Sequence, residues 1–271
     1  GFSDIYNSST FHWRLRETLM ANRANIPVVI LPQTIGPFYC IKNYNIAKSI
    51  LKSAKFVFVR DAKFVDELDK MEVRYELTKD LSAYMMPEKW DIDIRQNSIG
   101  LNVSGLCYSN SFRSLSGQFE CYPLLINAII QRFQDKGLNV YLIPHSYNYQ
   151  QPEESNDDIV ACRAAFDKLS SKKGVYLIDM DLLSPQIKYV ISKMSFFCGT
   201  RMHANFAAIY TGVPLFGLAY SYKFEGAFDA NGLNGKEQTT TINNICFNDI
   251  PSIVDKIEQV YIKLTNNSED L

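Results

Sequence analysis

The sequence predicts an α/β protein with two doubly wound domains that face a cleft, each built on a parallel sheet. Short, continuous apolar runs alternate with longer stretches whose apolar residues recur at helical spacing. Continuous apolar strands separated by helices are typical of a parallel sheet covered on both faces. The rhythm breaks over residues 82–97, which hold charges, a proline and a tryptophan, and then restarts. A chain of 271 residues has room for two such domains.

The first domain, residues 1–85, is expected to be incomplete at its beginning, because the chain starts with Gly1 rather than methionine. Its predicted strands are 26–31, 55–59 and 75–78, and its predicted helices are 45–54 and 62–71.

The second domain is predicted over residues 98–248, followed by a closing helical segment, 249–271. Its predicted strands are 98–103, 140–143, 175–178, 195–198 and 214–218. Its predicted helices are 121–136, ended by Gly137, then 157–169, one that opens at Ser184 as N-cap with Pro185, and one that starts near Arg201.

Composition excludes several classes of function. The net charge is −1, so the chain has little attraction for a nucleic-acid backbone. The three histidines are far apart, which argues against a metal site, and nucleotide-binding glycine motifs are missing. Six scattered cysteines favour buried, reduced thiols in a cytoplasmic protein. A membrane-spanning run of about 18 apolar residues is also missing.

Side chains just after the strands are the candidates for a site, because open parallel sheets bind ligands beyond the carboxyl ends of their strands. Arg201 and His203 follow the strand at 195–198, where the next helix is expected to start. Helix N-termini attract anions, and a guanidinium grips a carboxylate or phosphate with two hydrogen bonds. An Arg-x-His pair alone is more often structural, but its place at this turn favours an anion site.

Four other side chains follow strands or lie in a loop of the second domain. His145 is a candidate for proton transfer or a histidine that caps the backbone. Lys223 completes a positive pocket or lies in solvent, and Tyr220 can stack on a sugar. Arg113 has no evident packing role in its Ser- and Gly-rich loop, although solvent exposure is its simpler interpretation.

In the first domain, Gln33 and Thr34 follow a strand and offer neutral hydrogen bonds that suit sugar hydroxyls, or form a purely structural turn. Arg60, Asp61 and Asp80 also follow strands, and an internal ion pair or a helix cap is their favoured interpretation.

Taken together, these segments resemble the polysaccharide pyruvyl transferase family. The matching segments, in family order, are Gly1–Tyr6, Leu31–Phe38 (LPQTIGPF), Val59–Asp61, Asp80, Ile143–His145, Gly199–Ala204 (GTRMHA) and Tyr220–Lys223. LPQTIGPF and RMHA are the most specific of them.

The resemblance implies a GT-B-like fold of two Rossmann-like domains, with further strands and helices before the segment that matches Gly1–Tyr6. It implies transfer of pyruvyl from phosphoenolpyruvate to sugar hydroxyls, forming a pyruvate ketal on a surface polysaccharide or its lipid-linked precursor, as in capsule and exopolysaccharide biosynthesis. Phosphoenolpyruvate would be the donor substrate, with no cofactor and no metal. The protein would be cytoplasmic, either free or peripheral at the inner face of the membrane.

Arg201 and His203 match the family's donor-binding positions, and Asp4 matches an acidic position that helps the acceptor. The expected donor-binding side chains are Arg201, His203, Lys223 and Arg113. The expected acceptor-binding side chains are Gln33, Thr34 and Tyr220. The candidates for proton transfer are His203, His145 and Asp4.

Two other functions stay open at this point. One is a nucleotide-sugar glycosyltransferase of similar architecture. The other is a non-catalytic sugar-binding or scaffolding relative that kept the fold.

Overall fold

The computed structural model describes residues 2–4, 8–148 and 156–266. Over these residues the chain divides into two compact units. The first consists of Gly1–Leu81 with Gly226–Leu233, and the second of Ser82–Glu225 with Asn234–Leu271. Residues 82–97, where the apolar rhythm of the sequence breaks, therefore belong to the second unit, and no local pattern indicated that 226–233 would group with the first.

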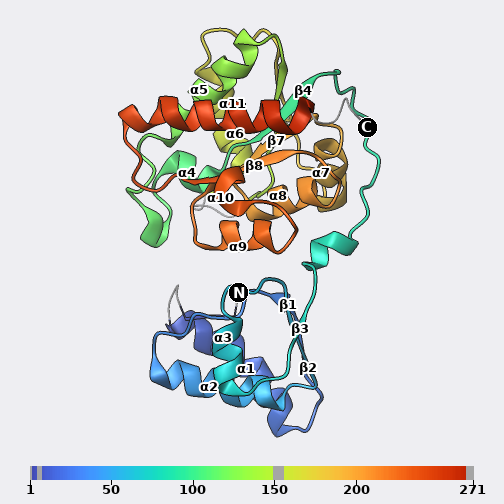
Figure 1. Cartoon of the computed structure of the whole chain (residues 1–271), viewed down its shortest axis with the longest axis vertical. Helices are drawn as coiled ribbons and strands as arrows, with labels where there is room; N and C mark the ends of the chain where they lie inside the picture. Colours follow the sequence, from blue (N-terminus) through green and yellow to red (C-terminus); the bar gives the residue numbers. More distant parts are fainter. Residues whose placement is uncertain (1, 5–7, 149–155, 267–271) are drawn as a thin grey trace. The chain divides into compact units, whose positions relative to one another are not determined.

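The first unit contains a parallel sheet with helices on one side. Among the described residues this sheet has three strands in the order β1-β2-β3, namely β1 (Val29–Gln33), β2 (Phe56–Val59) and β3 (Glu76–Leu77). Its helices are α1 (Ser8–Arg23), α2 (Ile41–Ser53) and α3 (Val65–Met71). Figure 1 shows all of them on the same side of the strands.

Alternation along the strands explains where the core of the first unit lies. Ile30, Val57 and Val59 are buried in one cluster with residues of the helices. Val29 and Phe56, which pair across β1 and β2, point away from that cluster and are exposed.

The second unit is built on a larger parallel sheet. Its described part has six strands in the order β6-β5-β4-β7-β8-β9. The strands are β4 (Ser98–Asn102), β5 (Asn139–Leu142), β6 (Val175–Leu177), β7 (Phe196–Gly199), β8 (Leu215–Ala219) and β9 (Thr239–Thr241). The order reverses between β4 and β7, because β5 and β6 extend the sheet on one side and β7, β8 and β9 on the other.

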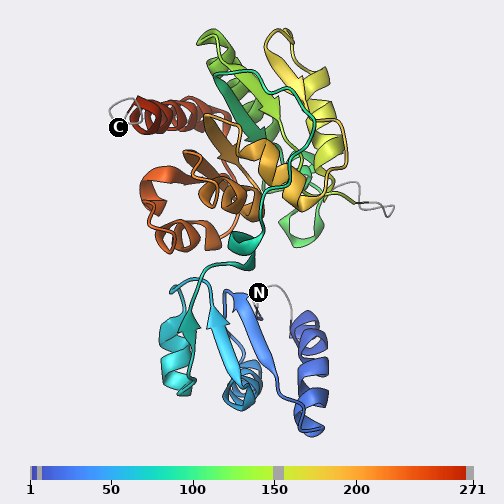
Figure 2. The same cartoon turned by 90° about the vertical axis from the view of Figure 1, so that its right-hand side faces the viewer.

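Helices cover both faces of this sheet (Figure 2). One face packs in a single core against α5 (Tyr122–Asp135), α6 (Asp158–Asp167) and α11 (Ile250–Asn266). On the other face, α7 (Ser184–Ile191) packs against α8 (Met202–Ile209), which lies on β7 and β8. The shorter helices are α4 (Gly105–Ser109) and α10 (Gly235–Gln238), and α9 (Lys223–Asp229) starts in this unit and ends in the segment grouped with the first.

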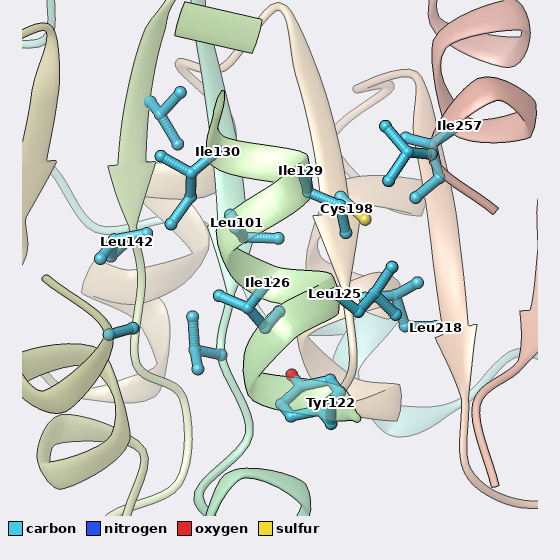
Figure 3. Close-up of a cluster of buried hydrophobic side chains, with 14 of the residues drawn as sticks. Leu101, Tyr122, Leu125, Ile126, Ile129, Ile130, Leu142, Cys198, Leu218 and Ile257 are labelled. Atoms are coloured by element: carbon cyan, nitrogen blue, oxygen red, sulfur yellow. The ribbon is translucent and has the colours of Figure 1, made fainter. Parts of the chain in front are cut away.

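Figure 3 shows part of this core, where α5 packs against the strands. The side chains there are apolar and fully or almost fully buried, and burial of each leucine or isoleucine is worth roughly 1.5–3 kcal/mol. They are Leu125, Ile126, Ile129 and Ile130 of α5, Leu101, Leu142, Cys198 and Leu218 of the strands, and Ile257 of α11.

Most of the predicted elements are found, with shifted ends. The first strand starts at Val29 rather than at 26, and α7 is capped by Leu183, so that Ser184 is its first helical residue rather than its N-cap. Apolar periodicity did not predict α1, α4, α9, α10 or β9. Among the described residues, no helix has both the length and the apolar character needed to cross a lipid bilayer.

A buried lysine fixes the segment that enters the second unit. Lys188 of α7 is 2% exposed, and its Nζ donates to the backbone oxygens of Ser82 (2.8 Å) and Met85 (2.6 Å). The ammonium also lies 5.6 Å from the centre of the Tyr210 ring. Burial lowers the pKa of Lys188, but these partners still satisfy its charge.

We predict that Lys188→Met lowers the free energy of unfolding of the second unit by roughly 1.5–3 kcal/mol, because two carbonyls lose a charged donor. It should also speed proteolysis within residues 82–97. Urea unfolding and limited proteolysis measure both effects. Lys193→Met is the control, since Lys193 is exposed on the ring of Tyr189. Equal stability of the two variants would contradict the assignment.

Candidate functional site

The candidate site lies at the carboxyl edge of the second sheet, where the strand order reverses between β4 and β7. Ligands of open α/β sheets bind at such switch points. The segments that follow β4, β5 and β7 meet here, and the helix N-terminus of α8 opens onto the same edge.

A buried carboxylate joins these segments. Asp158, the first residue of α6, is 0% exposed. Its Oδ1 accepts from the backbone N–H of Gly105 (2.8 Å). Its Oδ2 accepts from the backbone N–H groups of His145 and Ser146 (both 3.1 Å) and from Nδ2 of Asn102 (3.2 Å).

Arg201 completes this cluster as the cationic partner of Asp158. Its Nη2 lies 2.7 Å from Oδ1 of Asp158, and its Nε donates to the same oxygen at 3.1 Å. Nη2 also donates to the backbone oxygen (3.0 Å) and to Oδ1 (2.9 Å) of Asn156. Burial opposes the charge, but the pull of Asp158 outweighs it, so the pKa of Arg201 lies above its ordinary value.

This geometry corrects the expectation for Arg201. The sequence predicted a guanidinium open to an anionic donor, whereas the structure places it inside the unit in an ion pair, with its side chain 11% exposed. The reason is Asp158, a partner distant in sequence that was assigned only to a helix. The hydrogen bonds described for the guanidinium involve Nε and Nη2.

His145 is an uncharged imidazole at neutral pH. It is half-buried after β5, and its pKa is lowered to about 4, chiefly by burial. Asp158 opposes this shift, and the charges of His203 and Arg201 contribute to it. His145 therefore cannot act as a proton donor at neutral pH unless something negative first raises its pKa.

His203 is the second residue of α8 and is exposed, with its ring edge-on to Phe206 at 5.7 Å. Its charge acts on the pKa of His145, so the two imidazoles lie near each other. Arg201 is the N-cap residue of α8 and makes no side-chain cap hydrogen bond. The first turn of this helix is therefore an electropositive point between the two histidines.

The hydroxyl of Tyr122 connects two of the loops at the site. This hydroxyl accepts from the backbone N–H of Ser104 (3.1 Å) and bonds to Oγ1 of Thr200 (2.7 Å). Tyr122 lies at the start of α5 in Figure 3, and it is fully buried. The loops after β4 and β7 are thus hydrogen-bonded to the same buried hydroxyl.

The other predicted donor and acceptor residues of the second unit differ in their surroundings. Tyr220 is half-buried after β8, edge-on to Phe224 (5.6 Å), and near enough to Arg201 to affect its pKa. Lys223 starts α9 with its Nζ 5.7 Å from the Tyr222 ring. Arg113 is exposed at a positive φ of 48°, with its guanidinium 5.0 Å from the Phe112 ring.

In the first unit, Asp4 caps α2. Its carboxylate accepts from the backbone N–H groups of Tyr39 (2.9 Å) and Cys40 (3.0 Å) and from Nδ2 of Asn43 (2.9 Å). Burial opposes the charge, but these hydrogen bonds prevail and lower the pKa of Asp4. A carboxylate held in this way is a weak base, so the expected role of Asp4 in proton transfer is not supported by its surroundings.

A polar network occupies the loops that follow the strands of the first unit. Thr34 is 2% exposed and donates to Oδ2 of Asp61 (2.5 Å), so it is a structural residue rather than the expected acceptor contact. Arg60 pairs with Asp80 (2.7 Å), which confirms the predicted internal ion pair. Gln33 is half-exposed and donates to the backbone oxygen of Leu31 (3.4 Å), so acceptor binding by Gln33 stays a prediction.

The cysteines are free thiols, but they are not all buried as expected. Cys107, Cys162 and Cys198 are buried, whereas Cys40 and Cys246 are exposed. Within the described ranges, no group of three or more His, Cys, Asp or Glu residues is arranged to hold a metal ion.

A sequence model of polysaccharide pyruvyl transferases matches residues 1–222. The chain belongs to the polysaccharide pyruvyl transferase family. No curated protein matches the chain in sequence.

Solved structures show that this pyruvyl transferase family member has a GT-B-like fold. The UDP-GlcNAc 2-epimerase of Methanocaldococcus jannaschii aligns with 90% of the chain at a TM-score of 0.57 and 10% identity. The UDP-GlcNAc 2-epimerase of Neisseria meningitidis, bound to UDP-GlcNAc, aligns with 92% at 0.56 and 14% identity. The chain spans 64% and 67% of these two structures, respectively.

Asn102, Tyr122 and Asp158 shape the site of this pyruvyl transferase family member, although the sequence did not single them out. Asn102 carried a signal, because it is a polar residue in an otherwise apolar strand. It is fully buried, and its Oδ1 accepts from the backbone N–H of Arg201 (2.8 Å). Asp158 carried no such signal in the sequence, since an acidic residue in the first turn of a helix is common.

We predict that Asp158→Asn lowers the free energy of unfolding of the second unit by about 3–5 kcal/mol, because it leaves the guanidinium of Arg201 buried without its counter-charge. Urea unfolding followed by hydrogen exchange of β4, β5 and β7 measures the change. Adding Arg201→Met should recover part of the loss by removing the unpaired charge.

Asp157→Asn is the matched control. Asp157 is the N-cap of α6 and accepts from the backbone N–H of Ile159 (2.8 Å). Asparagine caps helices about as well as aspartate, so the expected loss is below about 1 kcal/mol. Similar losses of unfolding free energy in the two variants would contradict a specific contribution of the ion pair of Asp158 and Arg201.

Proposed function

We propose that this protein transfers the pyruvyl group of phosphoenolpyruvate to sugar hydroxyls of a surface polysaccharide or its lipid-linked precursor, forming a pyruvate ketal. Family membership supports the reaction class. The observation that carries the proposal is the turn at Arg201, where His145 and His203 flank the N-terminus of α8 at the carboxyl edge of the second sheet.

Charge balance suggests how the donor binds. Phosphoenolpyruvate carries a carboxylate and a phosphate with a charge of about −1.5 to −2. Asp158 already neutralises Arg201, so the guanidinium adds little net charge. The backbone N–H groups of the first turn of α8, Nη1 of Arg201 and the two imidazoles supply the rest, and Lys223 is a further candidate cation.

The reaction needs one proton donor and one acceptor. A proton adds to C3 of phosphoenolpyruvate, which leaves a cation-like centre at C2, and a sugar hydroxyl attacks C2 and loses its proton. The bond between C2 and the phosphate oxygen breaks, and phosphate leaves. A second hydroxyl then attacks C2, loses its proton and closes the ketal. Nothing is oxidised or reduced, and no cofactor is required.

The two histidines suit these roles. The phosphate of the bound donor raises the pKa of His145 above its value of about 4 in the free protein, so that the imidazole is protonated in the complex and can deliver its proton to carbon. His203, in its neutral form, accepts the proton of the sugar hydroxyl. General acid–base help of this kind contributes about 10²–10⁴-fold to the rate.

We expect phosphoenolpyruvate binding at pH 7.5 to take up protons, and Gln at position 145 to abolish most of that uptake. Above about pH 6, where the phosphate keeps most of its charge, affinity should rise as the pH falls, because free His145 is neutral there and becomes protonated on binding. Calorimetry in two buffers of different ionisation enthalpy counts the protons. His12→Gln is the control, since His12 bonds to Asn43 in the first unit. Equal uptake by His145→Gln and the unchanged protein would refute the coupling.

Incubation with phosphoenolpyruvate and a panel of glycosides should give one added pyruvyl group per acceptor and one released phosphate, read by mass spectrometry and a phosphate assay. His203→Ala should lower kcat by about 10²–10⁴-fold while the fold stays intact, because His203 is exposed. His12→Ala should leave kcat unchanged. Turnover of His203→Ala at the full rate would remove His203 from the mechanism.

A nucleotide-sugar enzyme is the second candidate, because one solved structure of the same fold is bound to UDP-GlcNAc. Thermal unfolding separates the two functions. Stabilisation by UDP-GlcNAc and not by phosphoenolpyruvate would favour the second candidate. Failure to release phosphate with any acceptor would favour a non-catalytic sugar-binding protein.

A further inference from the structure

A polar cavity of about 510 Å³ lies in the second unit, at the end of the sheet opposite the candidate site. It surrounds the amino ends of β5 and β6, whereas Arg201 follows the carboxyl end of β7 in the same parallel sheet. Strands of four residues separate the two ends by about 13 Å. The volume falls within the range of roughly 300–1,000 Å³ that small ligands occupy.

Two cations line the cavity without an acidic partner among the described residues. Arg95 is exposed, and its Cζ lies 5.4 Å from the centre of the Tyr176 ring. That ring stacks on Tyr141, with centroids 4.7 Å apart and planes at 19°. The guanidinium therefore rests on a fixed aromatic support, and Lys173, which is exposed, is a lining residue of the same cavity.

Fixed acceptors line the rest of the cavity. Nε2 of Gln134 donates to the backbone oxygens of Ser171 (3.2 Å) and Lys173 (2.7 Å), and Nδ2 of Asn139 donates to that of Gln96 (3.1 Å). Because the amino groups of these amides are used, their side-chain oxygens are oriented as acceptors.

Asp135 adds a carboxylate to these acceptors. Its Oδ1 accepts from Nε2 of Gln131 (2.8 Å), which orients the group and leaves Oδ2 as a further acceptor. The lining residues of the cavity thus include two cations and three residues with side-chain acceptors.

This set of groups selects a class of ligand. A simple anion such as phosphate satisfies the cations but has too few hydroxyl donors for the acceptors, and the charge of Asp135 repels it. A neutral sugar satisfies the acceptors but leaves the cations unused. A sugar residue that carries one carboxylate satisfies both, since its hydroxyls donate to the acceptors and its carboxylate binds the cations.

We propose that this cavity binds an acidic saccharide, with its carboxylate on Arg95 and Lys173 and its hydroxyls on Asp135, Gln134 and Asn139. The binding itself does not depend on the proposed reaction. Its purpose rests on the proposed function: a pyruvate ketal carries a carboxylate, so the cavity would hold an acidic unit of the same polymer while another unit reacts.

The test is an NMR titration of the full chain with trigalacturonate, followed through the side-chain amides of Gln134 and Asn139. Galactotriose and acetate are the neutral and the anionic comparisons. Arg95→Gln combined with Lys173→Gln should weaken trigalacturonate binding at least tenfold. Lys172→Gln is the matched control, because Lys172 is the neighbouring lysine and already pairs with Asp167 (3.3 Å). It should change affinity less than twofold.

We expect trigalacturonate to bind more tightly than either comparison, and thermal unfolding should show that every variant is folded. Absence of binding, equal binding by the double variant, or equal affinity for acetate or galactotriose would overturn the proposal. The readout is independent of the candidate site, so His203→Ala should bind trigalacturonate normally. If trigalacturonate binds but no glycoside of the panel accepts a pyruvyl group, the proposed function is rejected and the cavity assignment stands.

Discussion

The ion pair of Asp158 and Arg201 determines the shape of the carboxyl edge of the second sheet. Removing two charges from water costs several kcal/mol for each, and attraction alone rarely compensates for it. Here the carboxylate also accepts hydrogen bonds from backbone groups after β4 and β5, and the guanidinium binds Asn156 as well. The pair is therefore the point at which three loops and the start of α8 take one arrangement.

This pairing makes the site of the free protein nearly neutral. A site built from unpaired arginine would be a permanent cation and would bind any anion. His145 adds no charge in the free protein, because its pKa is about 4. A multiply charged anion beside it would raise that pKa, so that under the proposed function anion binding and proton uptake are coupled.

The sheets could be predicted well from the sequence, because a short, continuous apolar run between amphipathic helices is typical of a buried parallel strand. The turn at Arg201 was also predicted, as was an internal ion pair or helix cap for Arg60, Asp61 and Asp80, although the partner of Arg60 was not. Prediction failed where a partner is distant in sequence. Nothing local marks Asp158 as the counter-charge of Arg201, and nothing near Thr34 or Asp4 shows that their side chains are already engaged. Short elements such as β9 and α10 were missed because a few residues carry no periodicity.

The charged side chains that follow the strands have different partners in the two units. In the first unit, the charged side chains that follow the strands engage one another or cap helices, as Arg60 with Asp80 and Asp4 with α2 do. Such groups are already satisfied and have little capacity left for a substrate. In the second unit, Arg201, His145 and His203 lie around a helix N-terminus whose own cap is not filled by a side chain. The proposed anion site therefore rests on the second unit alone.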